Sequence, residues 1–170
     1  MNGSRPVLPE PWLRGTLREV PAVPRAVLHA LELTKEDIWR WCFGLSDEQL
    51  NDRPGEIAPV AFHLRHMARS LDRLLTYAEG GALDKEQLSL LKSELQPEAK
   101  HDELFAELEN ALARSEQRVR RLATADFERP RGVGKKQLPT TIGGLLVHVA
   151  DHTLRHVGQA ITTARLVARR

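Results

Sequence analysis

Three histidines recur at intervals of four residues near the end of the chain: His148, His152 and His156. In an α-helix this interval projects successive side chains from nearly the same side of the cylinder. Two neutral imidazoles four residues apart can bind one divalent cation, and a third ligand from a facing helix leaves a fourth position for water or substrate. The spacing therefore favours a metal site, with hydrogen-bonded histidines and no metal as the alternative.

The apolar spacing of the same segment indicates which two of these histidines face the core. Positions three and four residues apart form one seam, which we expect to contain Ile142, Leu145, Val149, His152, His156, Gln159 and Thr163. His148 lies about 40° from His152, on the side away from that seam. Burial of two unpartnered imidazoles costs about 1 to 3 kcal/mol each, so His152 and His156 need a partner.

The third ligand is expected from the segment Phe62-His63-Leu64-Arg65-His66. His66 shares its helical face with polar side chains, whereas an apolar stripe occupies another face: Leu64, Met67, Leu71 and Leu75. His63 is about 60° round the helix from His66, so only one of the two is expected to reach a metal. We therefore predict that His66, His152 and His156 are the ligands.

Other polar residues near these histidines are candidates for the pocket. Arg73 and Tyr77 lie beyond His66 on its face and are candidates for contacting a substrate anion, and Gln159 is a candidate for orienting a ligand. His63 and His148 are further pocket residues or a fourth metal ligand. Each of these side chains has a structural alternative, in which its stem packs on the protein and its polar tip lies in water.

Helical periodicity in four segments predicts the elements that must position these residues. No strand-like alternation of useful length competes with it, and an all-α, up-and-down four-helix bundle follows. The expected helices span residues 25–43, 59–78, 102–123 and 141–167.

Proline and glycine predict the connections between these helices. Residues 1–24 are expected to form an extended N-terminal capping arm, pinned by Trp12, Leu13 and Leu17, and residues 25–170 the bundle domain. Short helical segments are expected from Ser46 and over 84–94, and the breaker-rich segment 124–139 is expected to be a loop.

Composition excludes several classes of function. The net charge is only +2, with basic and acidic residues interleaved, so we expect no nucleic-acid partner. Cys42 is the only cysteine, which leaves neither an intrachain disulfide nor a cysteine-based metal cluster. No run of about 18 apolar residues appears, and the N-terminus lacks the apolar core of a signal peptide. We expect a cytoplasmic protein without membrane contact.

The segments 44–51, 62–68 and 148–159, the last ending in HxxxHxGQ, together resemble the DinB-like family. This resemblance implies a four-helix bundle with a three-histidine site for nickel or zinc, which maps onto His66, His152 and His156, and a homodimer. Some members, or near relatives with this bundle, are thiol-dependent S-transferases or isomerases that use a low-molecular-weight thiol. Zincin proteolysis is excluded because Thr153, not Glu, follows His152.

Two functions remain open on this reasoning. The first is a metal-dependent enzyme that activates a thiol or water against a small-molecule substrate, of S-transferase or hydrolase type. The alternative is a non-catalytic, metal-binding dimeric bundle protein. A free fourth coordination position favours the enzyme, whereas a fourth protein ligand favours the structural role.

Overall fold

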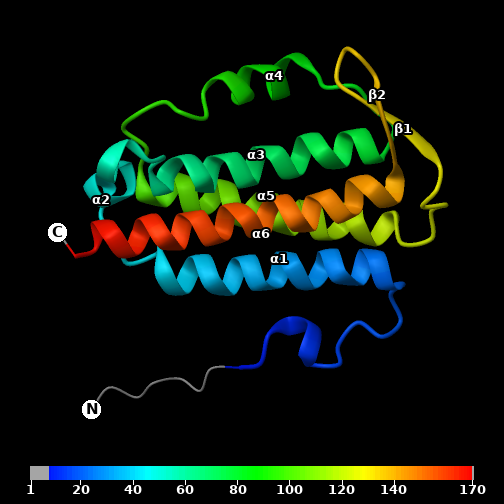
Figure 1. Ribbon diagram of the computed structural model, residues 1–170, viewed down its shortest axis with the longest axis horizontal. Coiled ribbons are helices and arrows are strands. Elements are labelled where there is room, and N and C mark those ends of the chain that lie inside the picture. Colours follow the sequence, from blue (N-terminus) through cyan, green and yellow to red (C-terminus); the bar gives the residue numbers. More distant parts are fainter. Residues whose placement is uncertain (1–7, 170) are drawn as a thin grey trace.

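A four-helix bundle forms the body of the computed structural model, which describes residues 8–169. Its helices are α1 (Ala22–Trp41), α3 (Val60–Ala78), α5 (His101–Arg121) and α6 (Ile142–Val167). Helices α1 and α3 each pack against both α5 and α6 (Figure 1). The fully buried side chains at the centre include Ile38, Leu64, Met67, Leu71, Leu75, Leu108, Val119 and Leu146. The predicted all-α fold is confirmed, and no helix within 8–169 is long and apolar enough to cross a membrane.

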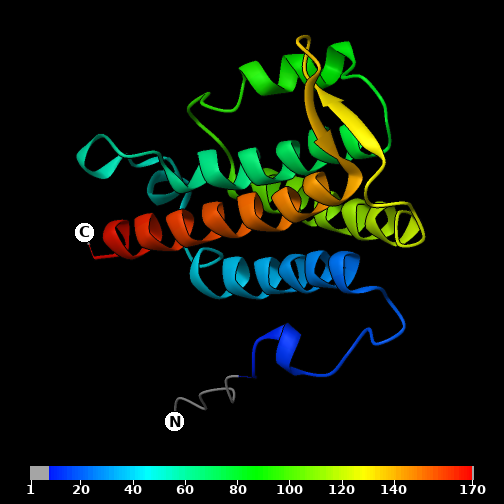
Figure 2. The same ribbon diagram turned by 45° about the vertical axis from the view of Figure 1, so that its right-hand side comes forward.

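The helix directions differ from the expected up-and-down order. Helices α3 and α5 run in the same direction, and α1 and α6 run in the opposite one (Figures 1 and 2). Arg69 near the middle of α3 bonds to Glu107, and Arg118 further along α5 bonds to Glu79, as a parallel pair requires. The cause is the segment between them, in which α4 (Lys85–Lys92) carries the chain back along the bundle before α5 begins.

Side-chain caps define the short helices. Ser46 forms a capping box with Gln49 at the start of α2 (Asp47–Asn51), and Asp84 does so with Gln87 at the start of α4. Helix α1 begins at Ala22, three residues before the expected start, because Pro24 lies in the first turn, where the missing N–H would have no helical partner.

The segment expected to be a loop contains a β-hairpin. Strands β1 (Pro130–Val133) and β2 (Leu138–Thr141) pair antiparallel, with Gly132 opposite Pro139. The breakers are compatible with this hairpin because its two strands have free edges, where proline needs no ladder partner. Gly134 takes a positive φ of 70° in the connecting turn. Thr141 then caps α6 through a bond from the Gly144 N–H, as expected.

The N-terminal arm is held differently from the prediction. Trp12 and Leu13 are 62% and 57% exposed, and of the three expected anchors only Leu17 packs on the core. Arg14 is the main tether, because its guanidinium makes two bonds of 2.6 and 2.7 Å to the Glu36 carboxylate on α1. Residues 1–7 of the expected arm lie outside the described residues.

Candidate metal centre

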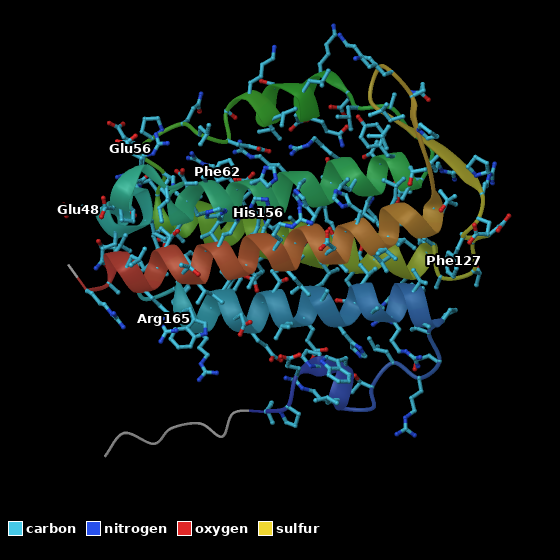
Figure 3. The ribbon with its side chains drawn as sticks, viewed as in Figure 1. Glu48, Glu56, Phe62, Phe127, His156 and Arg165 are labelled. Atoms are coloured by element: carbon cyan, nitrogen blue, oxygen red, sulfur yellow. The ribbon has the colours of Figure 1, made fainter. Side chains whose placement is uncertain are left out.

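Three imidazoles meet where the antiparallel helices α3 and α6 pack together. His66 comes from the middle of α3, and His152 and His156 come from successive turns of α6. Figure 3 shows His156 between these two helices, beside Phe62. The ring centroid of His66 lies 4.9 Å from that of His152 and 4.4 Å from that of His156. The centroids of His152 and His156 are 4.7 Å apart. The expected convergence of the three rings is present.

The nitrogen positions have the spacing of a metal site. One nitrogen from each of the three rings lies within 4.8 Å of the other two. The Nε2 atoms of His66 and His152 are 3.2 Å apart. Two ligand nitrogens about 2.1 Å from a tetrahedral metal are separated by about 3.4 Å. The three histidines could therefore hold one metal ion with little movement of their rings.

The buried seam of α6 differs from the predicted one. Its buried positions are Ile142, Leu145, Leu146, Val149, Thr153, Val157, Ala160, Thr163, Ala164 and Val167. Four of the seven predicted positions, Ile142, Leu145, Val149 and Thr163, are among them. His152 and His156 stand one residue before two of these positions and are half-buried, and Gln159 is exposed. The prediction placed both histidines and Gln159 on the seam itself, which is wrong by one position of the helix. The rings consequently lie at the boundary between core and solvent.

A buried carboxylate orients His66. The Glu94 side chain is 6% exposed, and its Oε2 lies 2.7 Å from His66 Nδ1. Burial raises the pKa of Glu94, but hydrogen bonds from His66 and Arg73 outweigh this, so the net pKa is lowered and the carboxylate is ionised. An ionised carboxylate only accepts, so His66 Nδ1 donates and its Nε2 lone pair faces the other two histidines. Sequence reasoning missed Glu94, which lies in a connecting segment with no motif.

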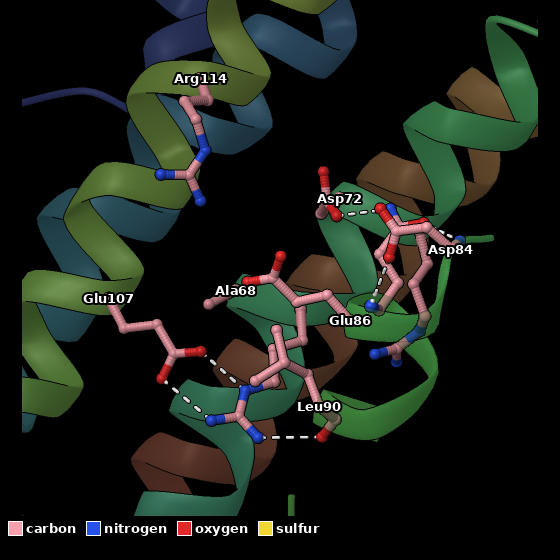
Figure 4. Close-up of a pocket in the computed structure, with 10 residues that line it drawn as sticks. Ala68, Asp72, Asp84, Glu86, Leu90, Glu107 and Arg114 are labelled. Atoms are coloured by element: carbon pink, nitrogen blue, oxygen red, sulfur yellow. Dashed lines mark hydrogen bonds and ion pairs between the residues drawn. The ribbon is translucent and has the colours of Figure 1, made fainter. Parts of the chain in front are cut away.

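Arg73, a candidate for contacting a substrate anion, bonds to the buried Glu94. Its Nη1 donates to Glu94 Oε1 at 2.7 Å, and the whole residue is buried. It also borders a cavity of about 230 Å³ between α3, α4 and α5. Figure 4 shows one ion pair between residues that line this cavity, in which Glu107 accepts two bonds from Arg69. Arg73 therefore supports the histidine site through Glu94.

His63 lies behind His156. The Nδ1 atoms of the two rings are 3.0 Å apart, so one of them donates to the other. This contact uses the side of His156 that faces away from a ligand at Nε2, and it leaves His63 outside the group of three. The expectation that only one of His63 and His66 would join the cluster agrees with this arrangement.

Burial keeps the imidazoles neutral. It lowers the pKa values of His63, His152 and His156 to about 4, and the neighbouring His66 ring adds to this effect in each case. Metal ligation requires a neutral imidazole with a free lone pair. The environment therefore prepares His152 and His156 for that role at neutral pH.

His152 is not satisfied by the protein alone. Its Nδ1 is buried without a hydrogen-bond partner among residues 8–169, and its Nε2 meets the Nε2 of His66. Since Glu94 holds the His66 proton on Nδ1, a His152 proton on Nδ1 would leave two Nε2 lone pairs facing each other. A proton on His152 Nε2 would instead leave a buried lone pair at Nδ1. A cation between the Nε2 atoms removes the first conflict, so the donor set fits a metal.

No fourth protein ligand joins the three histidines within the described part of the chain. The His148 side chain is 46% exposed, and its Nδ1 lies 3.8 Å from Asp151. His63 faces the outer nitrogen of His156, and Glu94 faces the outer nitrogen of His66. The candidates for a fourth ligand are thus turned elsewhere, which leaves a coordination position for water or substrate.

The remaining candidates lie apart from the three histidines. Tyr77 borders a separate cavity formed by the end of α3, α4 and the hairpin, eleven residues and about 16 Å along the helix from His66. Gln159 borders a cavity that His63 also lines. His29 lies 3.1 Å from Thr16 of the arm, and His101 contacts Phe43 just beyond the end of α1, so both are remote from the three histidines.

Comparison with known proteins identifies the family. The model of the DinB superfamily matches residues 30–160, a span that includes His66, His152, His156 and Glu94. No curated protein matches the chain. Since the matched span exceeds half of the sequence and its fold is the expected helical bundle, the chain belongs to the DinB superfamily.

Proposed function

We propose that this protein is a metal-dependent enzyme in which His66, His152 and His156 hold one divalent cation, nickel or zinc. The observation that carries the proposal is the convergence of three half-buried imidazoles with no fourth protein ligand among residues 8–169. Structural zinc sites are usually closed by four protein ligands, whereas catalytic sites keep a position open. The arrangement therefore supports catalysis over a purely structural clip.

The protein's own groups prepare this site. A bound divalent cation supplies Lewis acidity, which lowers the pKa of a thiol or water beside it. Glu94 fixes the proton of His66 on Nδ1, and Arg73 keeps Glu94 ionised. Such carboxylate–histidine pairs orient a ligand ring and raise its basicity.

We propose a thiol or water as the nucleophile, in an S-transferase or hydrolase type of reaction on a small molecule. Cys42, the only thiol of the chain, is fully buried, and burial together with Asp37 raises its pKa to about 12. A buried neutral thiol cannot serve as the nucleophile. A reacting thiol must therefore come from a co-substrate, which agrees with the use of low-molecular-weight thiols that the family resemblance implies.

Cobalt spectroscopy tests this proposal. Cobalt(II) reports its ligands through visible absorption, and a thiolate that binds it adds a sulfur-to-metal charge-transfer band in the near ultraviolet. We expect cobalt-loaded protein to show a low-coordinate spectrum and to gain that band when cysteine or glutathione is added. His152→Ala should lose both signals, and His148→Ala should keep both. If the cobalt spectrum changes neither with thiol nor with an anion that replaces metal-bound water, the coordination position is not open. This result would support the structural role.

A further inference from the structure

An open cavity of about 540 Å³ lies between the second half of α6 and the loop that precedes α3. Its apolar lining comes from Ile57, Ala58 and the Gly158 backbone. Its polar lining comes from His63, Arg155 and Gln159, together with Thr162 and Thr163, whose hydroxyls donate to backbone carbonyls. The size suits a small organic molecule. His63 joins this cavity to the histidine site, because its Nδ1 lies 3.0 Å from His156 Nδ1.

The outer nitrogen of His63 has no partner. The residue is only 5% exposed, yet its Nε2 makes no hydrogen bond within residues 8–169 and is not among the fully enclosed polar atoms. A nearly buried ring nitrogen that is both unpartnered and accessible, on a residue that lines a cavity, is available to a ligand in that cavity. This makes the cavity a prepared polar site and more than an apolar groove.

The proton on His63 follows from the histidine site. If His156 uses its Nε2 lone pair for the metal, its proton is on Nδ1 and donates to His63 Nδ1. Neutral His63 must then carry its own proton on Nε2. The cavity wall therefore presents an N–H donor at this point.

Two further donors border the same cavity. Arg155 uses only Nη2, in an exposed bond to Asp151, so its Nε and Nη1 have no partner in the described chain. The Gln159 amide is exposed and makes no hydrogen bond within the same residues. Among residues 8–169, Asp151 is the acid that pairs with a lining side chain, and it offsets part of the Arg155 charge. The cavity thus combines an imidazole N–H, a guanidinium and an amide with apolar walls.

We propose that this cavity is a subsite behind His156 that binds the carboxylate of a small organic acid with an apolar body. The assignment rests on the proposed function, because the His63 donor is set by the role of His156. The carboxylate accepts from His63 and Arg155, since acceptor oxygens with negative charge suit convergent donors. The apolar body lies against Ile57 and Ala58.

Phenylacetate and its neutral analogue phenylacetamide test the subsite, by calorimetric titration of the zinc-loaded full-length protein. We expect phenylacetate to bind at least about tenfold tighter than phenylacetamide, because a charge-assisted hydrogen bond is lost with the amide. Arg155→Met keeps the stem of the side chain and should weaken phenylacetate by about tenfold while changing phenylacetamide little. Equal affinity for the two compounds would overturn the proposal.

A cavity-filling variant separates this site from the metal itself. A Cβ at Gly158 would meet no atom within 4 Å, so the helix accepts a side chain there, and Gly158→Leu directs it at the cavity and removes a helix-weakening glycine. It should abolish phenylacetate binding, whereas Gln117→Leu, on the exposed face of α5, should leave it intact. If phenylacetate binds Gly158→Leu as tightly as the wild type, the subsite is overturned. If phenylacetate binds that variant only while zinc is present, it binds the metal, and the subsite is overturned as well.

Zinc titration of the same samples reports on the proposed function separately. Zinc binding without phenylacetate binding overturns the subsite alone. Phenylacetate binding that depends on Arg155 and Gly158, in a protein that takes up no zinc, supports the carboxylate cavity and overturns the metal-dependent function.

Discussion

Replacing Glu94 by glutamine should weaken metal binding although Glu94 does not contact the metal position. In the wild type both carboxylate oxygens accept: Oε1 from Arg73 and Oε2 from His66 Nδ1, each at 2.7 Å. Glutamine has one accepting oxygen and one donating amide nitrogen. The oxygen should turn to the charged Arg73, so the amide nitrogen faces His66 and favours the tautomer with its proton on Nε2. That tautomer has no lone pair for the metal.

The expected magnitude follows from the partners of Glu94. Removing a carboxylate that orients a histidine ligand typically lowers metal affinity by about 10- to 100-fold, or about 1.4 to 2.7 kcal/mol. Both partners of Glu94 are largely buried, with side chains 17% and 10% exposed, so water replaces the carboxylate poorly. We therefore expect the upper half of that range.

Competition against a chromophoric zinc chelator measures the affinity. Glu107→Gln is the matched control, because Glu107 also accepts from an α3 arginine at 2.7 Å but touches no histidine. It should leave zinc affinity within about twofold of the wild type. Equal zinc affinity for Glu94→Gln and Glu107→Gln would refute the orienting role of Glu94.

The remaining predictions concern stability and reactivity. Burial lowers the pKa values of His63, His152 and His156 to about 4, below the unfolded value of about 6.5, so the unfolded chain binds more protons as pH falls through that window. As pH falls from 6.5 to 4.5, the free energy of unfolding of the metal-free protein should decrease by up to about 1.4 kcal/mol per pH unit for each ring. A melting temperature that stays constant over this pH range would contradict this. Leu71→Ala should destabilise by about 2 to 5 kcal/mol in urea melts, because Leu71 is fully buried, while Leu95→Ala at an exposed site should change stability by less than about 0.5 kcal/mol. Cys42 should react with a thiol reagent only after unfolding, and stoichiometric labelling of the native protein would contradict its burial and raised pKa.

The sequence predicts the helices and the histidine trio well, because both depend on local spacing. The apolar positions of α3, Leu64, Met67, Leu71 and Leu75, are all fully buried, as their periodicity indicates. The same periodicity places His66 on another face, toward α6. In contrast, the middle of the α6 seam departs from its prediction. Ile142, Leu145, Val149 and Thr163 are buried as expected, but at His152, His156 and Gln159 the buried position is the next residue along the helix, because intervals of three and four fit two adjacent rows of this apolar helix.

Other features depend on contacts between distant segments and have no local signal. Glu94 meets His66 across 28 residues of chain, through a connecting segment whose path no spacing rule specifies. The parallel course of α3 and α5 depends on the return path through α4, which helix periodicity does not describe. The hairpin was obscured because Pro130, Gly132 and Pro139 weigh against strands in a buried sheet but not in one with two free edges.

Metal stoichiometry, measured by elemental analysis on protein purified without a metal-affinity column and then equilibrated with zinc, tests the three-histidine site most directly. The site predicts one tightly bound ion per chain in the wild type and in His148→Ala. It predicts loss of that ion in His66→Ala, His152→Ala and His156→Ala, each folded as judged by circular dichroism. A wild-type chain without zinc, or a His152→Ala variant that binds zinc as tightly as the wild type, would contradict the assignment of this site.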